Sequence, residues 1–161
     1  MNKLLGGKIM LIEYLADRPD LIPELAELHL AEWGHLRPGQ TLQDRVAALN
    51  GCTGKSSIPL GVVATHGNEL LGSALLVAHD MSTRQDLSPW LAGVFVKPAC
   101  RKVGVATELI QRIESEASAL GIHRLYLYTD KESDFYAKRG WSIHEACEYR
   151  GLSVTVMFKN L

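Results

Sequence analysis

The clearest pattern of apolar and polar positions in the chain runs over residues 89–120. It begins with an almost unbroken apolar run over residues 91–96, which is typical of a central strand covered on both faces. Gly93 interrupts this run, and a glycine inside a strand often marks a bulge or the close approach of a backbone or a ligand. A basic turn follows, and apolar residues then recur at the spacing of one buried helical face. Those positions are Ala106, Leu109, Ile110, Ile113, Ala117 and Leu120. We therefore expect a strand, a turn and a helix with Gly121 as its left-handed C-terminal cap.

Upstream of this stretch, the pattern predicts one strand and two helices. Residues 8–16 are mostly apolar and indicate a first strand. Asp20 is a favourable N-cap residue for an amphipathic helix over residues 21–33. The order Thr41-Leu42-Gln43-Asp44 is that of a capping box, which predicts a second, short helix.

The rest of the chain completes the order strand, helix, helix, three strands, helix, strand, helix and two strands. The remaining elements are expected as a hairpin over residues 60–65 and 70–79, a strand over 122–128, a short helix over 130–139, and a hairpin over 141–149 and 152–159. A charged connection leads from the first hairpin into the central strand. Without repeats or low-complexity tracts, the pattern predicts one domain over residues 1–161.

Composition is that of an ordinary globular protein and excludes several classes of function. The chain has 161 residues, 47% of them hydrophobic and 22% charged, and its net charge of −1 argues against a nucleic-acid partner or an acidic membrane surface. The apolar N-terminal positions are too few and too interrupted for a signal peptide or a membrane span. Three widely spaced cysteines and six scattered histidines predict neither disulfides nor a metal site, and a reducing, cytoplasmic location is the default.

The turn before the long helix has the chemistry of an anion site. The first amides of a helix have no partner within it and carry partial positive charge from the helix dipole. Lys97, Arg101 and Lys102 add positive charge, and Gly104 lets an anion approach the backbone. The alternative is an ordinary strand–helix connection with solvated lysines. Neither the Gly-Lys-Ser/Thr ending of a P-loop nor the three glycines of a dinucleotide fingerprint is present.

Two segments resemble sequence motifs of the GNAT acyltransferases. Residues 101–106, Arg-Lys-Val-Gly-Val-Ala, are similar to their phosphate loop, Gln/Arg-x-x-Gly-x-Gly/Ala. Residues 134–141 resemble their Phe-Tyr-x-x-x-Gly-Phe segment, with Trp141 as the last aromatic. The resemblance implies an α+β, GNAT acyl-CoA N-acyltransferase fold, a splayed mixed sheet of six to seven strands flanked by about four helices. In that fold the pantetheine arm lies where the sheet parts beside the central strand, near Gly93.

The resemblance also implies transfer of an acetyl group from acetyl-CoA to a primary amine of a small molecule or peptide. Backbone groups of the central strand would hold the pantetheine arm and the developing oxyanion, and amides of the turn would hold the pyrophosphate. The implied cofactor-binding residues are Val94, Phe95, Val96, Arg101, Lys102, Val103, Gly104, Val105, Ala106, Thr107, Phe135 and Tyr136. Tyr136 is the expected general acid, because a tyrosine keeps its proton at neutral pH and can protonate the leaving sulfur. The alternative is that Tyr136 only packs against its neighbours.

The general base and the acceptor site are less well defined by the resemblance. Many family members carry a glutamate on the central strand, whereas Trp90-Leu91-Ala92-Gly93 contains no titratable group. His79, Asp80 and Glu32 are the candidate bases, although His79 and Asp80 also fit an exposed hairpin end. Glu32 and Trp33 would bind a cationic amine through charge and a cation–π contact, although Trp33 fits a core position equally well.

Two classes of function remain open at this point. A catalytically inactive acyl-CoA-binding protein would keep the phosphate loop without the chemistry; the missing strand carboxylate favours it, whereas Tyr136 favours an enzyme. The chain also loosely resembles acetyltransferases of protein N-termini, of the actin N-acetyltransferase type, which hardly narrows the acceptor. The expected partners are acetyl-CoA and an amine, without nucleic acid, membrane or metal, for a monomer or homodimer.

Overall fold

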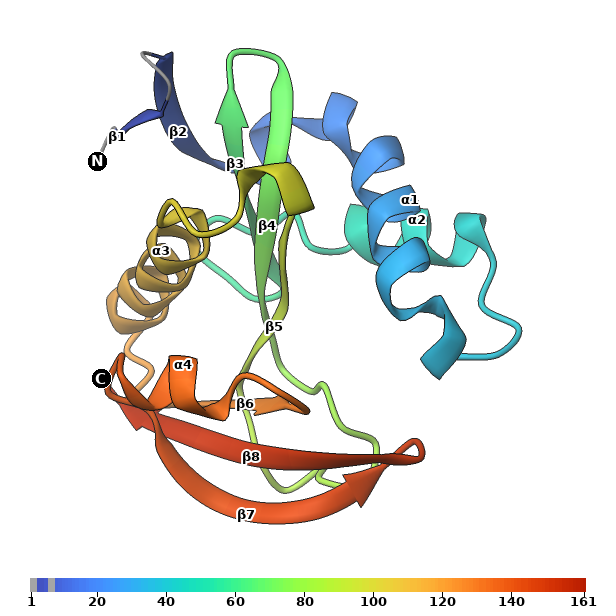
Figure 1. The fold of residues 1–161 in the computed structure, drawn as a ribbon, viewed down its shortest axis with the longest axis vertical. Helices are drawn as coiled ribbons and strands as arrows, with labels where there is room; N and C mark the ends of the chain where they lie inside the picture. The colour runs from blue at the N-terminus through green and yellow to red at the C-terminus, as the bar shows by residue number, and fades with distance from the viewer. Residues whose placement is uncertain (1–2, 6–7) are drawn as a thin grey trace.

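The computed structural model describes residues 3–5 and 8–161, which form one mixed sheet of eight strands and the helices around it (Figure 1). Neighbouring strands follow the order β1-β2-β3-β4-β5-β6-β8-β7, and only β5 and β6 pair in parallel. The strands are β1 (Lys3–Leu5), β2 (Lys8–Tyr14), β3 (Leu60–His66), β4 (Glu69–Val77), β5 (Trp90–Val96), β6 (Arg124–Thr129), β7 (Ser142–Tyr149) and β8 (Leu152–Asn160). The α-helices are α1 (Ile22–Trp33), α2 (Leu42–Asn50), α3 (Val105–Ala119) and α4 (Ser133–Ala137). None of the helices in this described part is long and apolar enough to cross a membrane.

The predicted fold class and element order are confirmed, with two differences near the N-terminus. The sheet has eight strands instead of six to seven, because β1 pairs with β2 at its edge. Asp20, the expected N-cap, instead lies in a 3₁₀ turn (Pro19–Leu21) that precedes α1. Arg18 Nε and Nη2 donate to its carboxylate at 3.1 and 3.0 Å, which keeps the carboxylate away from the helix amides. The prediction of an Asp20 cap is therefore wrong.

Two other helix ends follow their local sequence signals. The Thr41 hydroxyl accepts from the Asp44 amide at 3.1 Å, and the Asp44 carboxylate accepts from the Thr41 amide at 2.9 Å, so the capping box at the start of α2 is confirmed. At the end of α3, Gly121 has a φ of +79°, and the Ile122 amide donates to the Ala117 carbonyl at 3.0 Å. This is the Schellman pattern that a glycine at this position predicts.

The helices divide between the two faces of the sheet. The largest apolar cluster joins α3 to one face, and a second cluster joins α1 and α2 to the other. A third cluster lies where the connection between β4 and β5 packs against β6 and β8; it contains Met81, Leu87, Trp90, Tyr149, Val154 and Val156. The connection, which the sequence indicated only as charged, is therefore anchored by buried side chains at both ends.

The sheet parts beside β5, as the position of Gly93 predicts. Strand β5 pairs with β4 over most of its length but with β6 only through Trp90 and Tyr126, so its edge is open beyond that point. The register between β4 and β5 shifts between Ser73 and Leu75, and Gly93 in the facing bulge has a φ of +58°. A Cβ at Gly93 would also come within 2.8 Å of Leu75. Only glycine therefore fits the bulge without strain.

Candidate active site

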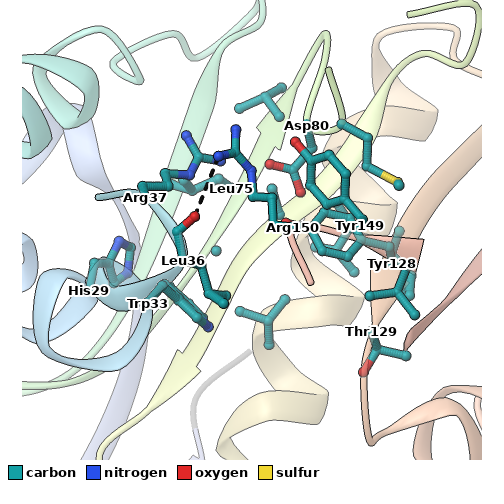
Figure 2. A pocket seen from close by; sticks show the side chains of 18 of the residues that line it. His29, Trp33, Leu36, Arg37, Leu75, Asp80, Tyr128, Thr129, Tyr149 and Arg150 are labelled. Atoms are coloured by element: carbon teal, nitrogen blue, oxygen red, sulfur yellow. Dashed lines mark hydrogen bonds between the residues drawn. The ribbon is translucent and has the colours of Figure 1, made fainter. Parts of the chain in front are cut away.

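A cavity of about 880 Å³ opens beside the parted strands (Figure 2). Its walls come from α1, the segment between α1 and α2, the connection after β4, the first half of β5, the end of β6 and the turn between β7 and β8. The predicted site residues that line it are Glu32, Trp33, His79, Asp80, Val94 and Tyr136. Residues far apart in the sequence therefore surround one space of the size that small-molecule ligands occupy.

A chain of hydrogen bonds connects α2 to the bulge of β5. Arg45 Nη2 lies 2.7 Å from His29 Nδ1, and His29 Nε2 lies 2.8 Å from Ser73 Oγ. Ser73 Oγ in turn donates to the Gly93 carbonyl at 2.8 Å. A guanidinium can only donate, so His29 Nδ1 accepts and its proton resides on Nε2. Each donor in the chain thus has one acceptor, and the chain holds the bulge carbonyl in one orientation.

His29 is a buried, neutral member of this chain. Its side chain is 1% exposed, and burial, with a further contribution from the Arg45 charge, lowers its pKa to about 3. The edge of the Trp33 ring packs against His29 with centroids 5.0 Å apart, and Phe95 lies 6.1 Å from both rings. The sequence analysis did not identify His29, although a histidine on the buried face of α1 beside Leu25 was an available signal.

Asp80 is the cavity carboxylate with the most perturbed acidity. Burial raises its pKa to about 6, against the opposing effect of the Arg37, Arg45 and Arg150 charges. No described residue forms a hydrogen bond or an ion pair with its carboxylate. His79 is exposed and lies beyond the end of β4 at Val77, and Glu32 is exposed on α1. Among the three candidate bases, only Asp80 is shielded from solvent, and its raised pKa suits a general base.

Tyr136 faces the same cavity from α4. Its side chain is 8% exposed and lies between the rings of Phe135 and Trp141, with centroid distances of 5.2 and 6.1 Å. Burial, followed by the nearby charge of Glu132, raises its pKa to about 12. In the part of the chain that the structure describes, its hydroxyl has no hydrogen-bond partner. The hydroxyl is therefore protonated at neutral pH and available to a ligand.

The basic turn lies outside this cavity, at the start of α3. Gly104 has a φ of +91° and Lys102 a φ of +65°, and no hydrogen bond within the described residues uses the amides of Gly104, Val105 or Ala106. Arg101 is exposed, and its Nε donates to the Val96 carbonyl at 2.8 Å. The turn therefore presents free amides and two exposed cations, as an anion site requires.

Three of the predicted residues near this turn have protein partners that the sequence did not reveal. Lys97 Nζ forms an ion pair with Glu24 at 2.7 Å, so its charge is balanced within the protein. The Thr107 hydroxyl accepts from Arg139 Nε at 3.0 Å, and the Arg139 guanidinium lies 3.5 Å from the centre of the Phe135 ring. Arg139 thus brings a cation to the start of α3 from a distant part of the chain, a residue that sequence analysis missed.

The structure brings the predicted residues into two adjoining groups. Val94 and Tyr136 lie with the candidate base and acceptor residues at the cavity, whereas Arg101 to Thr107 lie along the turn and the first part of α3. The parted edge of β5 lies between the two groups. Across the described ranges, no group of three or more His, Cys, Asp or Glu side chains is arranged to hold a metal ion.

The chain is similar to known acetyltransferases in sequence pattern and in fold. The model of the acetyltransferase (GNAT) family matches residues 22–141. An aminoglycoside 6'-N-acetyltransferase from Enterococcus faecium is 17% identical, with 93% of this chain and 96% of that chain covered and a TM-score of 0.71. An aminoglycoside 6'-N-acetyltransferase complexed with coenzyme A is also 17% identical, with 93% of this chain and 96% of that chain covered and a TM-score of 0.74. YncA from Salmonella typhimurium with acetyl-CoA is 16% identical, with 94% of each chain covered and a TM-score of 0.73. The family match confirms the predicted class of enzyme, an acyltransferase: this chain belongs to the GNAT acetyltransferase family.

Proposed function

We propose that the chain is a single-domain N-acetyltransferase that transfers an acetyl group from acetyl-CoA to a primary amine of a small molecule or peptide. The observation that carries the proposal is the open edge of β5 between a basic turn with free amides and a cavity that holds Asp80 and Tyr136. Coenzyme A ligands bound to two structural neighbours of the same fold support the choice of cosubstrate.

Acetyl-CoA would lie along these features in one direction. The amides of Gly104, Val105 and Ala106, with the exposed Arg101 and Lys102 side chains, would bind its pyrophosphate, because helix-terminal amides and cations together favour phosphate. The backbone groups of Val94, Phe95 and Val96 would bind the pantetheine arm as an added strand partner. Phe135 and Tyr136 would then lie beside the sulfur. The thioester supplies an activated acetyl group for direct attack.

The residues at the cavity divide the proton transfers between them. Asp80 accepts a proton from the acceptor ammonium, directly or through one water, and so frees the nitrogen lone pair that forms the new N–C bond. Backbone amides of β5 stabilise the negative charge that develops on the carbonyl oxygen. When the C–S bond breaks, the Tyr136 hydroxyl donates its proton to the leaving thiolate, and the second proton that the nitrogen loses returns to Tyr136 through solvent. Glu32 and Trp33 line the entrance for the amine.

The proposal is tested by incubating the purified protein with acetyl-CoA and a panel of amines while CoA thiol release is measured. An amine-dependent release above the hydrolysis rate supports an enzyme. Binding of acetyl-CoA by calorimetry without amine-dependent release would instead support an inactive acyl-CoA-binding protein, the second candidate, which the absence of a carboxylate from residues 90–93 favours.

Replacement of the proposed acid should slow the reaction without weakening binding. Tyr136→Phe removes only the hydroxyl, and we expect kcat to fall by about 100-fold, the lower range for general acid–base groups, with an unchanged KM for acetyl-CoA. Tyr126→Phe is the matched control, because Tyr126 is a half-buried tyrosine of β6 that does not line the cavity. Equal kcat values for Tyr136→Phe and the parent chain would contradict the assignment.

The role of the basic turn before α3 can be tested through its backbone conformation. Gly104→Ala places a side chain at a φ of +91°, so we expect the turn to shift and the dissociation constant for CoA to rise by about tenfold or more. Gly67→Ala is the control, because Gly67 has a φ of +59° in the β3–β4 turn, away from the site, and suffers a similar strain of about 1 kcal/mol. If calorimetry showed the same CoA affinity for both variants, the pyrophosphate would have to bind elsewhere.

A further inference from the structure

Three arginines from separate parts of the chain meet at the end of the cavity that contains Asp80. Arg37 follows α1, Arg45 lies on α2, and Arg150 lies in the turn between β7 and β8. All three charges act on the carboxyl group of Asp80, and Figure 2 shows Arg37 and Arg150 at the same end of the cavity as this carboxylate. With one carboxylate among three guanidinium groups, this end of the cavity has an excess of positive charge.

The excess charge is not neutralised by other acids. Arg45 is bound to the neutral His29. The Arg37 side chain is partly buried, and its guanidinium forms no hydrogen bond or ion pair with the residues described. Arg150 Nη1 donates to the Leu36 carbonyl at 3.4 Å, which joins the β7–β8 turn to the segment that carries Arg37. Two guanidinium groups therefore face the cavity without a carboxylate partner among the described side chains.

The backbone at Arg150 gives an independent indication of a binding role. Arg150 has a φ of +51° and the next residue, Gly151, has a φ of +79°, so both adopt the left-handed region in a two-residue hairpin turn. Such turns favour asparagine or glycine at the first position, whereas an arginine there is strained. Strained residues at the rim of a cavity are typical of ligand-binding positions.

We propose that the acceptor is an amine that also carries a carboxylate, as an amino acid does, and that Arg37 and Arg150 bind this carboxylate. This inference rests on the proposed function. The ammonium and carboxylate of one zwitterion match the adjoining Asp80 carboxylate and guanidinium groups of the site, and guanidinium groups bind carboxylates with two parallel hydrogen bonds. A polycationic acceptor such as an aminoglycoside, the class named for two structural neighbours, would meet repulsion from the same arginines.

The experiment compares acids with their amides, with the whole 161-residue chain, at constant ionic strength. The candidate acceptors are α- and ω-amino acids, the same compounds with the carboxylate converted to a carboxamide, and one aminoglycoside. Each is incubated with acetyl-CoA, and kcat/KM is measured by CoA thiol release. We expect the preferred amino acid to lose at least about tenfold in kcat/KM when its carboxylate is converted to an amide. In Arg37→Gln and Arg150→Asn this difference should shrink to about threefold or less, through a higher KM for the acid rather than a lower kcat.

The variants are chosen so that loss of folding does not explain the result. Asparagine suits the left-handed turn at position 150, so Arg150→Asn should keep or raise the melting temperature. Arg124→Gln is the matched control, because Arg124 is exposed on β6 and does not line the cavity. Turnover that is equal for acids and amides, or best for the aminoglycoside, would overturn the inference and leave the proposed function intact. An absence of turnover with every amine, in protein that binds acetyl-CoA, would overturn both.

Discussion

Asp80→Asn should lower kcat by about 100- to 10,000-fold, the range that general acid–base groups contribute, because the amide cannot accept a proton from the amine. In the parent chain, kcat/KM should rise with pH through an inflection near 6, the pKa to which burial raises the Asp80 carboxyl group. This inflection should be absent from the variant. The measurement is a pH–rate profile with one amine, and Asp86→Asn, exposed on the same connection, is the control.

The same substitution should stabilise the protein above pH 6. An acid whose pKa is higher in the folded than in the unfolded state opposes folding when it is ionised, and Asp80 is raised from 3.8 to about 6. The penalty is absent below about pH 4, grows between pH 4 and 6, and is complete above pH 6. Allowing for the partial exposure of Asp80, we expect Asp80→Asn to gain about 1–2 kcal/mol in urea unfolding at pH 8 and nothing at pH 4. Activity within threefold of the parent, or lost stability at pH 8, would contradict the role assigned to Asp80.

His29→Leu should destabilise the protein by about 3 kcal/mol at pH 8, because it leaves the half-buried Arg45 guanidinium without its acceptor and the buried Ser73 hydroxyl without its donor. The Gly93 carbonyl would lose its fixed orientation, so kcat/KM should also fall by about tenfold or more. The measurements are urea unfolding and the thiol-release assay. His123→Leu, at an exposed position before β6, is the control.

The pH dependence distinguishes His29 from an ordinary packing residue. Its pKa is lowered from 6.5 to about 3, so a proton favours the unfolded state and the parent chain loses this part of its stability as the pH falls below 6.5. The difference between the parent and His29→Leu should therefore narrow by roughly 1.4 kcal/mol for each pH unit below 6.5, so that a difference of about 3 kcal/mol at pH 8 disappears at about pH 4. A difference that stays constant with pH would mean that His29 is not held neutral by burial.

Local patterns were sufficient for the fold because each depends on residues near one another in the sequence. The apolar run of β5, the helical period of α3 and the capping box of α2 are confirmed, and Gly93 lies at the bulge where the sheet parts. The Asp20 cap failed for a local reason, since Arg18 offers its carboxylate a stronger partner than a helix amide. The extra strand β1 depends on pairing with β2.

The site shows what the sequence by itself determined and what only the tertiary structure decided. The basic turn before α3 and the aromatic segment of α4 are contiguous motifs, so their residue types and spacing were enough to predict a family and a binding place for the cosubstrate. Residues 37, 45 and 150 become neighbours of Asp80 only when the α1–α2 segment and the β7–β8 turn meet. A pKa depends on burial and on surrounding charges, neither of which a linear pattern contains. The choice of Asp80 as base, the chain through His29 and the cationic end of the cavity therefore required the folded molecule.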